Sequence, residues 1–164
     1  MKYMMMTVPH SGTRYVKTAF ERAGLRAIHS YRQIGIDRAS PDLIWWHASL
    51  KHWDRGMKSI AKETPKKFVV VRDPSMTWCT FMIGQMTAKD KDFHMGVKME
   101  ALEEHWISQD KILKEDNWHI HRVELDTFED LGNWAGMELP AHANKFSRGS
   151  YALKQAVLDR DEDK

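Results

Sequence analysis

The chain lacks several features that would assign it to a large class of proteins at once. It has a single cysteine, Cys79, so it cannot form an internal disulfide, and this agrees with a reducing compartment. No apolar run approaches the length of a membrane-spanning helix, and the opening residues are too short for a secretion signal. The formal net charge is only +2, without the basic clustering of nucleic-acid-binding proteins. We therefore expect a soluble, cytoplasmic protein with no membrane segment and no nucleic-acid partner.

Internal repeats, low-complexity stretches and linkers rich in proline, glycine and serine are also missing. The 164 residues suit one compact domain, and the 42% of hydrophobic residues suffice for a buried core. The last six residues are all acidic or basic. We expect a single domain over residues 1–158 and a charged, frayed tail over residues 159–164.

Apolar runs typical of strands alternate along the chain with segments of helical periodicity. The expected strands are Tyr3–Val8, Leu25–His29, Asp42–His47, Lys67–Arg72 and Trp118–Leu125. The expected helices are Thr13–Ala23, Pro74–Met86, Val97–Lys114 and a last one that Asp126 caps and that runs through Trp134. This alternation predicts a three-layer α/β/α fold with a mainly parallel central sheet. Ligands of such sheets bind at the carboxyl ends of the strands.

The loop after the first strand has the composition of an anion-binding turn. It reads Val8-Pro9-His10-Ser11-Gly12-Thr13-Arg14-Tyr15 and leads directly into a helix. A helix N-terminus offers unpaired N–H groups and the positive end of the helix dipole, and both favour an anion. Serine and threonine add hydroxyl donors, and His10 and Arg14 add further donors or charge. An ordinary capped strand-to-helix turn is the alternative interpretation.

No Gly-Lys-Ser or Gly-Lys-Thr occurs in the chain, so this loop is not that of a nucleoside triphosphatase. It resembles the 5′-phosphosulfate loop of the sulfotransferase family, Pro-[Lys/Arg]-Ser-Gly-Thr-Thr-aromatic. The residues that match are Pro9, Ser11, Gly12 and Thr13, with Tyr15 where the family places the aromatic ring that stacks on adenine. His10 replaces the usual lysine or arginine, and Arg14 replaces the second threonine. The resemblance implies a P-loop NTPase-like fold and a bound PAPS (3′-phosphoadenosine-5′-phosphosulfate), with PAP as the product.

A second motif follows the fourth expected strand. Arg72-Asp73-Pro74 and Thr80 resemble the family's 3′-phosphate site, an Arg-[Asp/Asn]-Pro run with a serine eight residues after the arginine. A structural arginine paired with a nearby carboxylate is the alternative. A third segment, with Arg148 and Gly149, is similar to a late Phe-x-Arg-Lys-Gly run whose basic residues close over the 3′-phosphate; a plain basic loop is its alternative.

The general base that the resemblance implies is a histidine just past the third strand, and His47 stands there. Histidine titrates near neutral pH and can accept a proton from a hydroxyl. His52 is the nearest competitor, and Glu21 or Glu63 remain alternatives because some members of the family use a glutamate. His119 and His121 share one strand face but lack a third ligand, so we expect no metal.

Taken together, these features predict a PAPS-dependent sulfotransferase. Its catalytic residues would be His47 and His10, and its cofactor-binding residues His10, Ser11, Gly12, Thr13, Arg14, Tyr15, Arg72, Thr80, Arg148 and Gly149. The acceptor, a small molecule or a glycan, is not specified by any motif. Two other functions stay open: a small kinase of a nucleotide or metabolite, and a catalytically inactive nucleotide-binding relative.

Overall fold

A computed structural model of the chain describes residues 1–30, 41–87 and 95–140 and confirms the predicted α/β class. Five parallel strands form one sheet in the order β2-β3-β1-β4-β5. The strands are β1 (Tyr3–Thr7), β2 (Ala27–His29), β3 (Leu43–His47), β4 (Lys66–Val71) and β5 (His119–Arg122). The helices are α1 (Thr13–Arg22), α2 (Leu50–His52), the π-helical turn η2 (Trp53–Met57), α3 (Lys58–Glu63), α4 (Pro74–Thr87), α5 (Met95–Glu115) and α6 (Phe128–Ala135).

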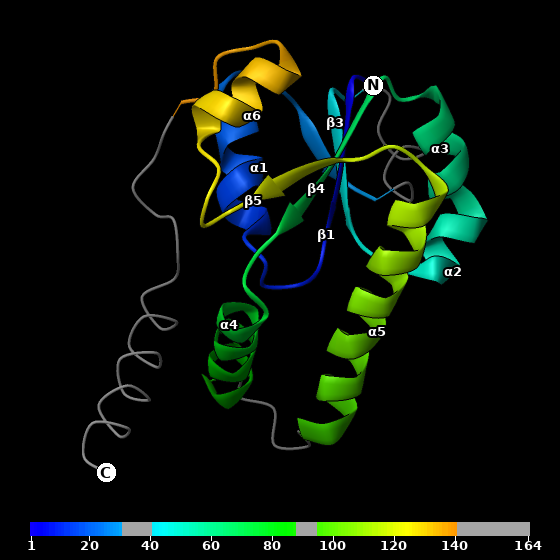
Figure 1. Cartoon of the computed structure of the whole chain (residues 1–164), viewed down its shortest axis with the longest axis vertical. Helices are drawn as coiled ribbons and strands as arrows, with labels where there is room; N and C mark the ends of the chain where they lie inside the picture. Colours follow the sequence, from blue (N-terminus) through cyan, green and yellow to red (C-terminus); the bar gives the residue numbers. More distant parts are fainter. Residues whose placement is uncertain (31–40, 88–94, 141–164) are drawn as a thin grey trace.

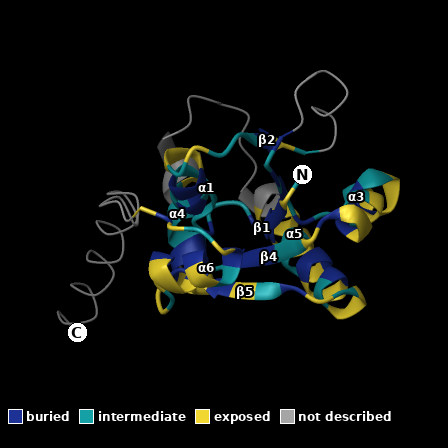
Figure 2. Ribbon diagram, turned by 90° about the horizontal axis from the view of Figure 1, so that it is seen from above, coloured by how far each residue is buried: buried dark blue, intermediate teal, exposed yellow. Residues whose placement is uncertain are grey.

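Helices cover both faces of the sheet, as the alternation of strands and helices predicts (Figure 1). On one face α1 and α6 pack against alternate strand residues, among them Met5 and Phe68. On the other face η2, α3 and α5 pack against Met4, Met6 and Val69. Figure 2 shows buried residues running through the strands between helices whose outer faces are exposed.

The three consecutive methionines of β1 are wholly buried because this strand lies in the middle of the sheet, with helices over both faces. A strand covered on both sides has no solvent-facing positions, and its sequence is therefore apolar up to Thr7, the polar residue that ends it. Two tryptophans, Trp46 and Trp53, are also buried and stack with ring centroids 6.1 Å apart. Both side chains therefore belong to the core.

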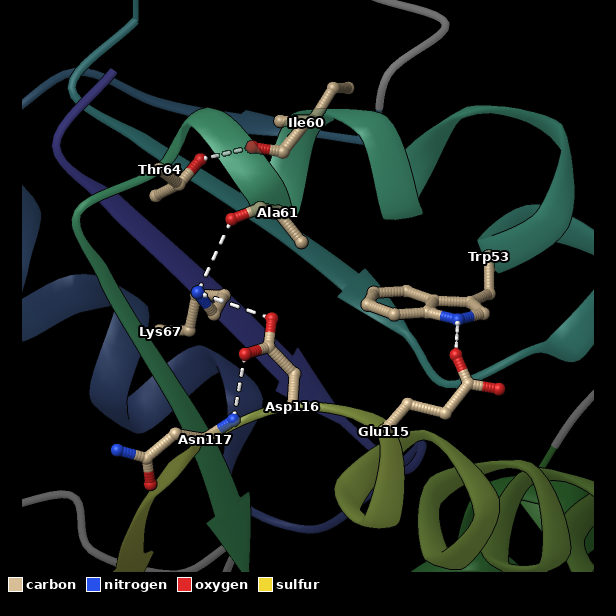
Figure 3. Close-up of polar contacts among 8 residues, drawn as sticks. All are labelled: Trp53, Ile60, Ala61, Thr64, Lys67, Glu115, Asp116 and Asn117. Carbon is tan, nitrogen blue, oxygen red and sulfur yellow. Dashed lines mark hydrogen bonds and ion pairs between the residues drawn. The ribbon is translucent and has the colours of Figure 1, made fainter.

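Polar contacts tie α3, β4 and the end of α5 together at the amino end of the sheet (Figure 3). Trp53 donates from its indole nitrogen to Glu115 at 2.7 Å. Lys67 forms an ion pair with Asp116 at 3.2 Å and donates to the carbonyl of Ala61 at 3.3 Å. These contacts connect the helices to the amino edge of the sheet. They involve none of the residues predicted for the site at the carboxyl edge.

The last strand is shorter than predicted, and its helix has a different cap. β5 ends at Arg122 because the chain turns there: the amides of Leu125 and Asp126 both donate to the Arg122 carbonyl. Asp126 accepts from the Arg122 amide at 2.7 Å, so the prediction that it caps α6 is wrong. Thr127 is the N-cap, in a reciprocal capping box with Asp130.

Of the helices that the structure describes, none combines the length and the apolar character needed to cross a bilayer. The predicted boundary at residue 158 and the charged tail after it lie outside the described residues.

Candidate functional site

Strand order brings three predicted features to one edge of the sheet: the loop after β1, His47 at the end of β3 and Arg72 after β4. β3, β1 and β4 are neighbours in the sheet, and the candidate loops follow the carboxyl ends of these three strands. The helix after β1 lies on one face of the sheet, whereas the helices after β3 lie on the other. Chains that leave neighbouring parallel strands toward opposite faces open a crevice at the strand ends, and ligands of α/β proteins bind in that crevice.

The loop after β1 is tightly wound. His10 has φ +65° and Gly12 has φ +97°, both in the left-handed region that a non-glycine residue such as histidine seldom adopts. Between them, Ser11 donates from its amide and its hydroxyl to the Val8 carbonyl, at 3.1 and 2.6 Å. The Ser11 hydroxyl proton is therefore used inside the loop, and Ser11 is buried. The strain at His10 is the kind that proteins keep at ligand-binding turns.

Gly12 is the N-cap of α1 and has no side chain that could cap the first amides of the helix. The reason for a glycine is visible in the packing. A Cβ on Gly12 would lie 2.9 Å from Cγ2 of Val123, the residue after β5. Close packing and the positive φ both demand glycine here, so its presence alone does not establish contact with a ligand.

Arg72 joins the two predicted motifs physically. It is buried just after β4, and its Nη1 donates to the carbonyl of His10 at 3.0 Å and to Oγ1 of Thr80 at 2.9 Å. Thr80 in turn donates to the carbonyl of Met76, one turn earlier in α4. The positive charge of Arg72 therefore lies next to the loop of residues 8–15, which we call the anion loop. Burial and this charge both lower the pKa of His10 below its usual value.

The Asp-Pro part of the second motif has a local explanation. The Asp73 carboxylate accepts from the amide of Ser75 at 2.7 Å, and the Asp73 carbonyl accepts from the amide of Thr77. Asp73 thus caps α4, and Pro74 occupies the first helical position, where its missing N–H costs nothing. Asp73 starts the helix that carries Thr80, and Arg72 is held against that helix.

His47 ends β3 directly beside the end of β1, in register with Thr7. Its Nδ1 lies 3.1 Å from Oγ1 of Thr7, and Thr13 of the anion loop donates to the same oxygen at 2.9 Å. A chain of three side chains thus connects the first turn of α1 with the predicted base. Burial lowers the pKa of His47 to about 4, with smaller contributions from His105 and other nearby histidines.

Other imidazoles surround His47. The rings of His29 and His105 lie 5.9 and 6.0 Å from it, centroid to centroid. His105 comes from α5, and its Nδ1 is 2.6 Å from the carbonyl of Ala48. His29 stacks on Trp45 at 4.0 Å, and burial lowers its pKa. In the part of the chain that the structure describes, no three such side chains are arranged so that they could hold a metal ion.

The competing bases have different positions. Glu21 is in the last turn of α1, where it pairs with Lys17 at 3.0 Å, and Glu63 ends α3. Helices that follow parallel strands run back across the sheet, so both carboxylates lie toward the amino edge. His52 lies in α2, close enough to His29 to contribute to its lowered pKa. Among the candidates, His47 has the direct contact with the loop after β1.

Tyr15 is half-buried and stacks on Phe128 of α6 at 4.6 Å. One face of its ring is therefore used in the core, which leaves at most the other face for an adenine. Burial raises the pKa of its hydroxyl. Arg14, by contrast, is exposed on the first turn of α1. Arg148 and Gly149 lie outside the described residues.

A hollow of about 730 Å³ lies elsewhere, around α6 and the segment after it. Among the described residues, its lining includes Glu129 and Glu138 and none of the predicted site residues, and Nζ of Lys66 lies beside Gly136 of this lining. We therefore keep the strand-end crevice as the candidate site.

Sequence reasoning missed Thr7 and His105. Thr7 carries a weak signal, since it is the one polar residue that ends the apolar run of β1. His105 carries none, because it is one polar residue among many in a long amphipathic helix and joins the site only through tertiary packing.

Comparison of the chain with models of protein families, with curated proteins and with solved structures found no match.

Proposed function

We propose that this protein is a sulfotransferase that transfers the sulfuryl group of PAPS to a hydroxyl or amine of an acceptor. The observation that carries the proposal is the Arg72 contact: Nη1 bonds both the His10 carbonyl and Thr80. Two segments, each resembling a different part of the family's nucleotide site, thereby share one buried cation.

The residues at the strand ends suit a nucleotide with two separate anionic groups, the 5′-phosphosulfate and the 3′-phosphate. The open first turn of α1 and the charge of Arg72 both favour phosphate or sulfate oxygens. The amides from Gly12 to Arg14 would hold the 5′-phosphosulfate, and Arg72 would hold the 3′-phosphate. The hydroxyls of Thr13 and Thr80 can donate to these groups only if they give up their bonds to Thr7 and to the Met76 carbonyl. The Ser11 hydroxyl contributes only if it gives up its bond to Val8.

In the proposed reaction, a bond forms between the acceptor oxygen and sulfur, and the bond from sulfur to the 5′-phosphate oxygen breaks. The electron pair of the broken bond stays on the phosphate, and PAP leaves. His47 takes the acceptor proton at Nε2, while His10 donates to the departing oxygen. Because the pKa of His47 is about 4, this side chain is unprotonated at neutral pH, as a base must be.

The experiment that tests the proposal compares thermal unfolding with PAP, 5′-AMP and Mg-ATP, each at millimolar concentration. A ligand at a hundred times its Kd stabilises a protein by about 2.7 kcal/mol, which is several degrees for a domain of this size. We expect a shift with PAP and a much smaller one with 5′-AMP, because only PAP carries the 3′-phosphate.

The other results of this experiment argue against the proposal. A shift with Mg-ATP alone would favour a kinase. No shift with any nucleotide would remove the support for a nucleotide site. If PAP binds but [35S]PAPS transfers no label to a panel of phenols, sugars and amines, the protein is better described as a nucleotide-binding relative.

A further inference from the structure

The hydroxyl of Thr7 is fully buried at the junction of the anion loop and His47. Its oxygen has three polar neighbours: Thr13 Oγ1 at 2.9 Å, His47 Nδ1 at 3.1 Å and the Trp46 carbonyl at 3.5 Å. A threonine hydroxyl has one proton to donate and two lone pairs to accept with. All three contacts can be hydrogen bonds at once only for one placement of the protons.

The Trp46 carbonyl decides this placement, because a carbonyl oxygen can only accept. The single Thr7 proton must point to it if that contact is to be a bond. Thr7 then accepts from both other neighbours, so Thr13 donates its hydroxyl proton and His47 donates from Nδ1. The opposite assignment, with Thr7 donating to Nδ1, leaves the Trp46 contact without a proton and an N–H on the Nε2 side of the ring.

From this we infer that Thr7 is a positioning residue, which holds His47 in the tautomer with the proton on Nδ1 and the lone pair on Nε2. The role of His47 as the base of the reaction rests on the proposed function. The tautomer of its imidazole depends only on the contacts of Thr7. An imidazole accepts a proton only at a bare nitrogen, so this tautomer presents Nε2 to the acceptor.

The same arrangement links base and loop. Thr13 belongs to the first turn of α1, whose amides the proposed function assigns to the phosphosulfate. Its hydroxyl proton is used on Thr7, so Thr13 supports the base through one intervening residue. Thr7 thus couples the ring orientation of His47 to the position of the anion loop.

The test is a measurement of the His47 tautomer by 1H–15N long-range correlation NMR at neutral pH, on the full chain without ligand. In the wild type we expect a protonated Nδ1 and a bare Nε2. Thr7→Val keeps the shape but removes the acceptor, and we expect the Nε2–H form to become populated. Thr7→Ser restores the hydroxyl and should restore the wild-type pattern.

Activity gives the second readout. If the protein transfers label from PAPS, Thr7→Val should lower kcat by roughly tenfold to a hundredfold, the range for lost supporting hydrogen bonds. The Kd for PAP should stay within about twofold, and Thr7→Ser should recover most of kcat. A purely structural role would lower kcat and raise the Kd for PAP together, without recovery in Thr7→Ser.

Thr64→Val is the matched control for the loss of a buried threonine hydroxyl. Thr64 is also buried, and it donates to the Ile60 carbonyl at 2.7 Å at the end of α3, away from the site (Figure 3). This variant should lose stability and leave the His47 pattern unchanged. If Thr7→Val fails to fold, Thr7→Ala removes the same hydroxyl and should likewise populate the Nε2–H form.

Two results would overturn the inference: a wild-type His47 with its proton on Nε2, or a tautomer that Thr7→Val does not change. Failure of the proposed function leaves a different trace. In that case PAP does not bind, while the tautomer still responds to Thr7.

Discussion

The guanidinium of Arg72 donates a hydrogen bond to the carbonyl oxygen of His10 at 3.0 Å, across 62 residues of chain. His10 has a left-handed backbone, and its carbonyl faces the end of the neighbouring strand because of that conformation. A buried cation is costly unless its hydrogen bonds are met, so the position of Arg72 and the shape of the loop depend on each other. A change at either residue should therefore affect the anion loop.

Arg72→Lys tests this dependence. Lysine keeps the charge but cannot bond the His10 carbonyl and Thr80 with the same planar geometry. We expect PAP affinity to fall by roughly 30-fold, which corresponds to about 2 kcal/mol, with little change for 5′-AMP. Isothermal titration calorimetry measures both. Arg122→Lys, an exposed arginine at the end of β5, is the control and should bind PAP like the wild type.

Gly12→Ala should destabilise the fold for two separable reasons. The residue has φ +97°, and the new Cβ would meet Val123 at 2.9 Å. Gly24→Ala is the matched control, because Gly24 has φ +89° but no atom within 4 Å of the Cβ position. We expect about 1 kcal/mol of destabilisation at Gly24 and about 1–3 kcal/mol more at Gly12.

Urea unfolding measures this difference. Gly12→Ala should cost less stability in a Val123→Ala background than in the wild type, because the contact of the new Cβ with Val123 is reduced. Equal losses at the two glycines would show that contact with Val123 is unimportant.

Stability should depend on pH through His47. Its pKa is about 4 in the folded chain, against 6.5 when the ring is unperturbed, so between these values only the unfolded chain binds the proton. The stabilisation is complete above about pH 6.5 and is lost as the pH falls toward 4, by on the order of 3 kcal/mol. His47→Gln should unfold with a shallower pH dependence over this window.

Urea titrations from pH 7.5 to 4 measure the effect as the difference between wild type and variant. His10 and His29 also have lowered pKa values and contribute to both proteins, so they cancel to first order. Parallel curves for the two proteins would contradict the burial of a neutral His47.

His47→Gln should also separate catalysis from binding. If His47 is the base, transfer from PAPS should fall by at least a hundredfold, while the Kd for PAP stays within about twofold. His119→Gln is the control: this histidine also lies at a strand of the sheet, stacked on Trp134 at 4.5 Å, outside the site. Weaker PAP binding with retained transfer would assign His47 to the nucleotide instead.

Local chemistry made much of the fold predictable. The run of consecutive methionines in β1 requires helices on both faces, and the Asp73-Pro74 pair starts α4 where the sequence indicates. The last strand was harder, because Val123 to Leu125 keeps an alternating pattern although the chain turns at Arg122. Thr127 and Asp130 supply the capping box, whose geometry competes successfully with the cap expected at Asp126.

The amino-acid sequence by itself determined the parallel α/β class, the loop of residues 8–15 and the arginine after β4, since each depends on neighbours along the chain. Only the tertiary structure decided that β3, β1 and β4 are adjacent, because strand order depends on long-range packing. The tertiary structure likewise placed His105 beside His47 and stacked Tyr15 on Phe128. Thr7 shows the reason most clearly: its hydrogen-bond partners come from the first turn of α1 and from the end of β3, and no local pattern encodes their meeting.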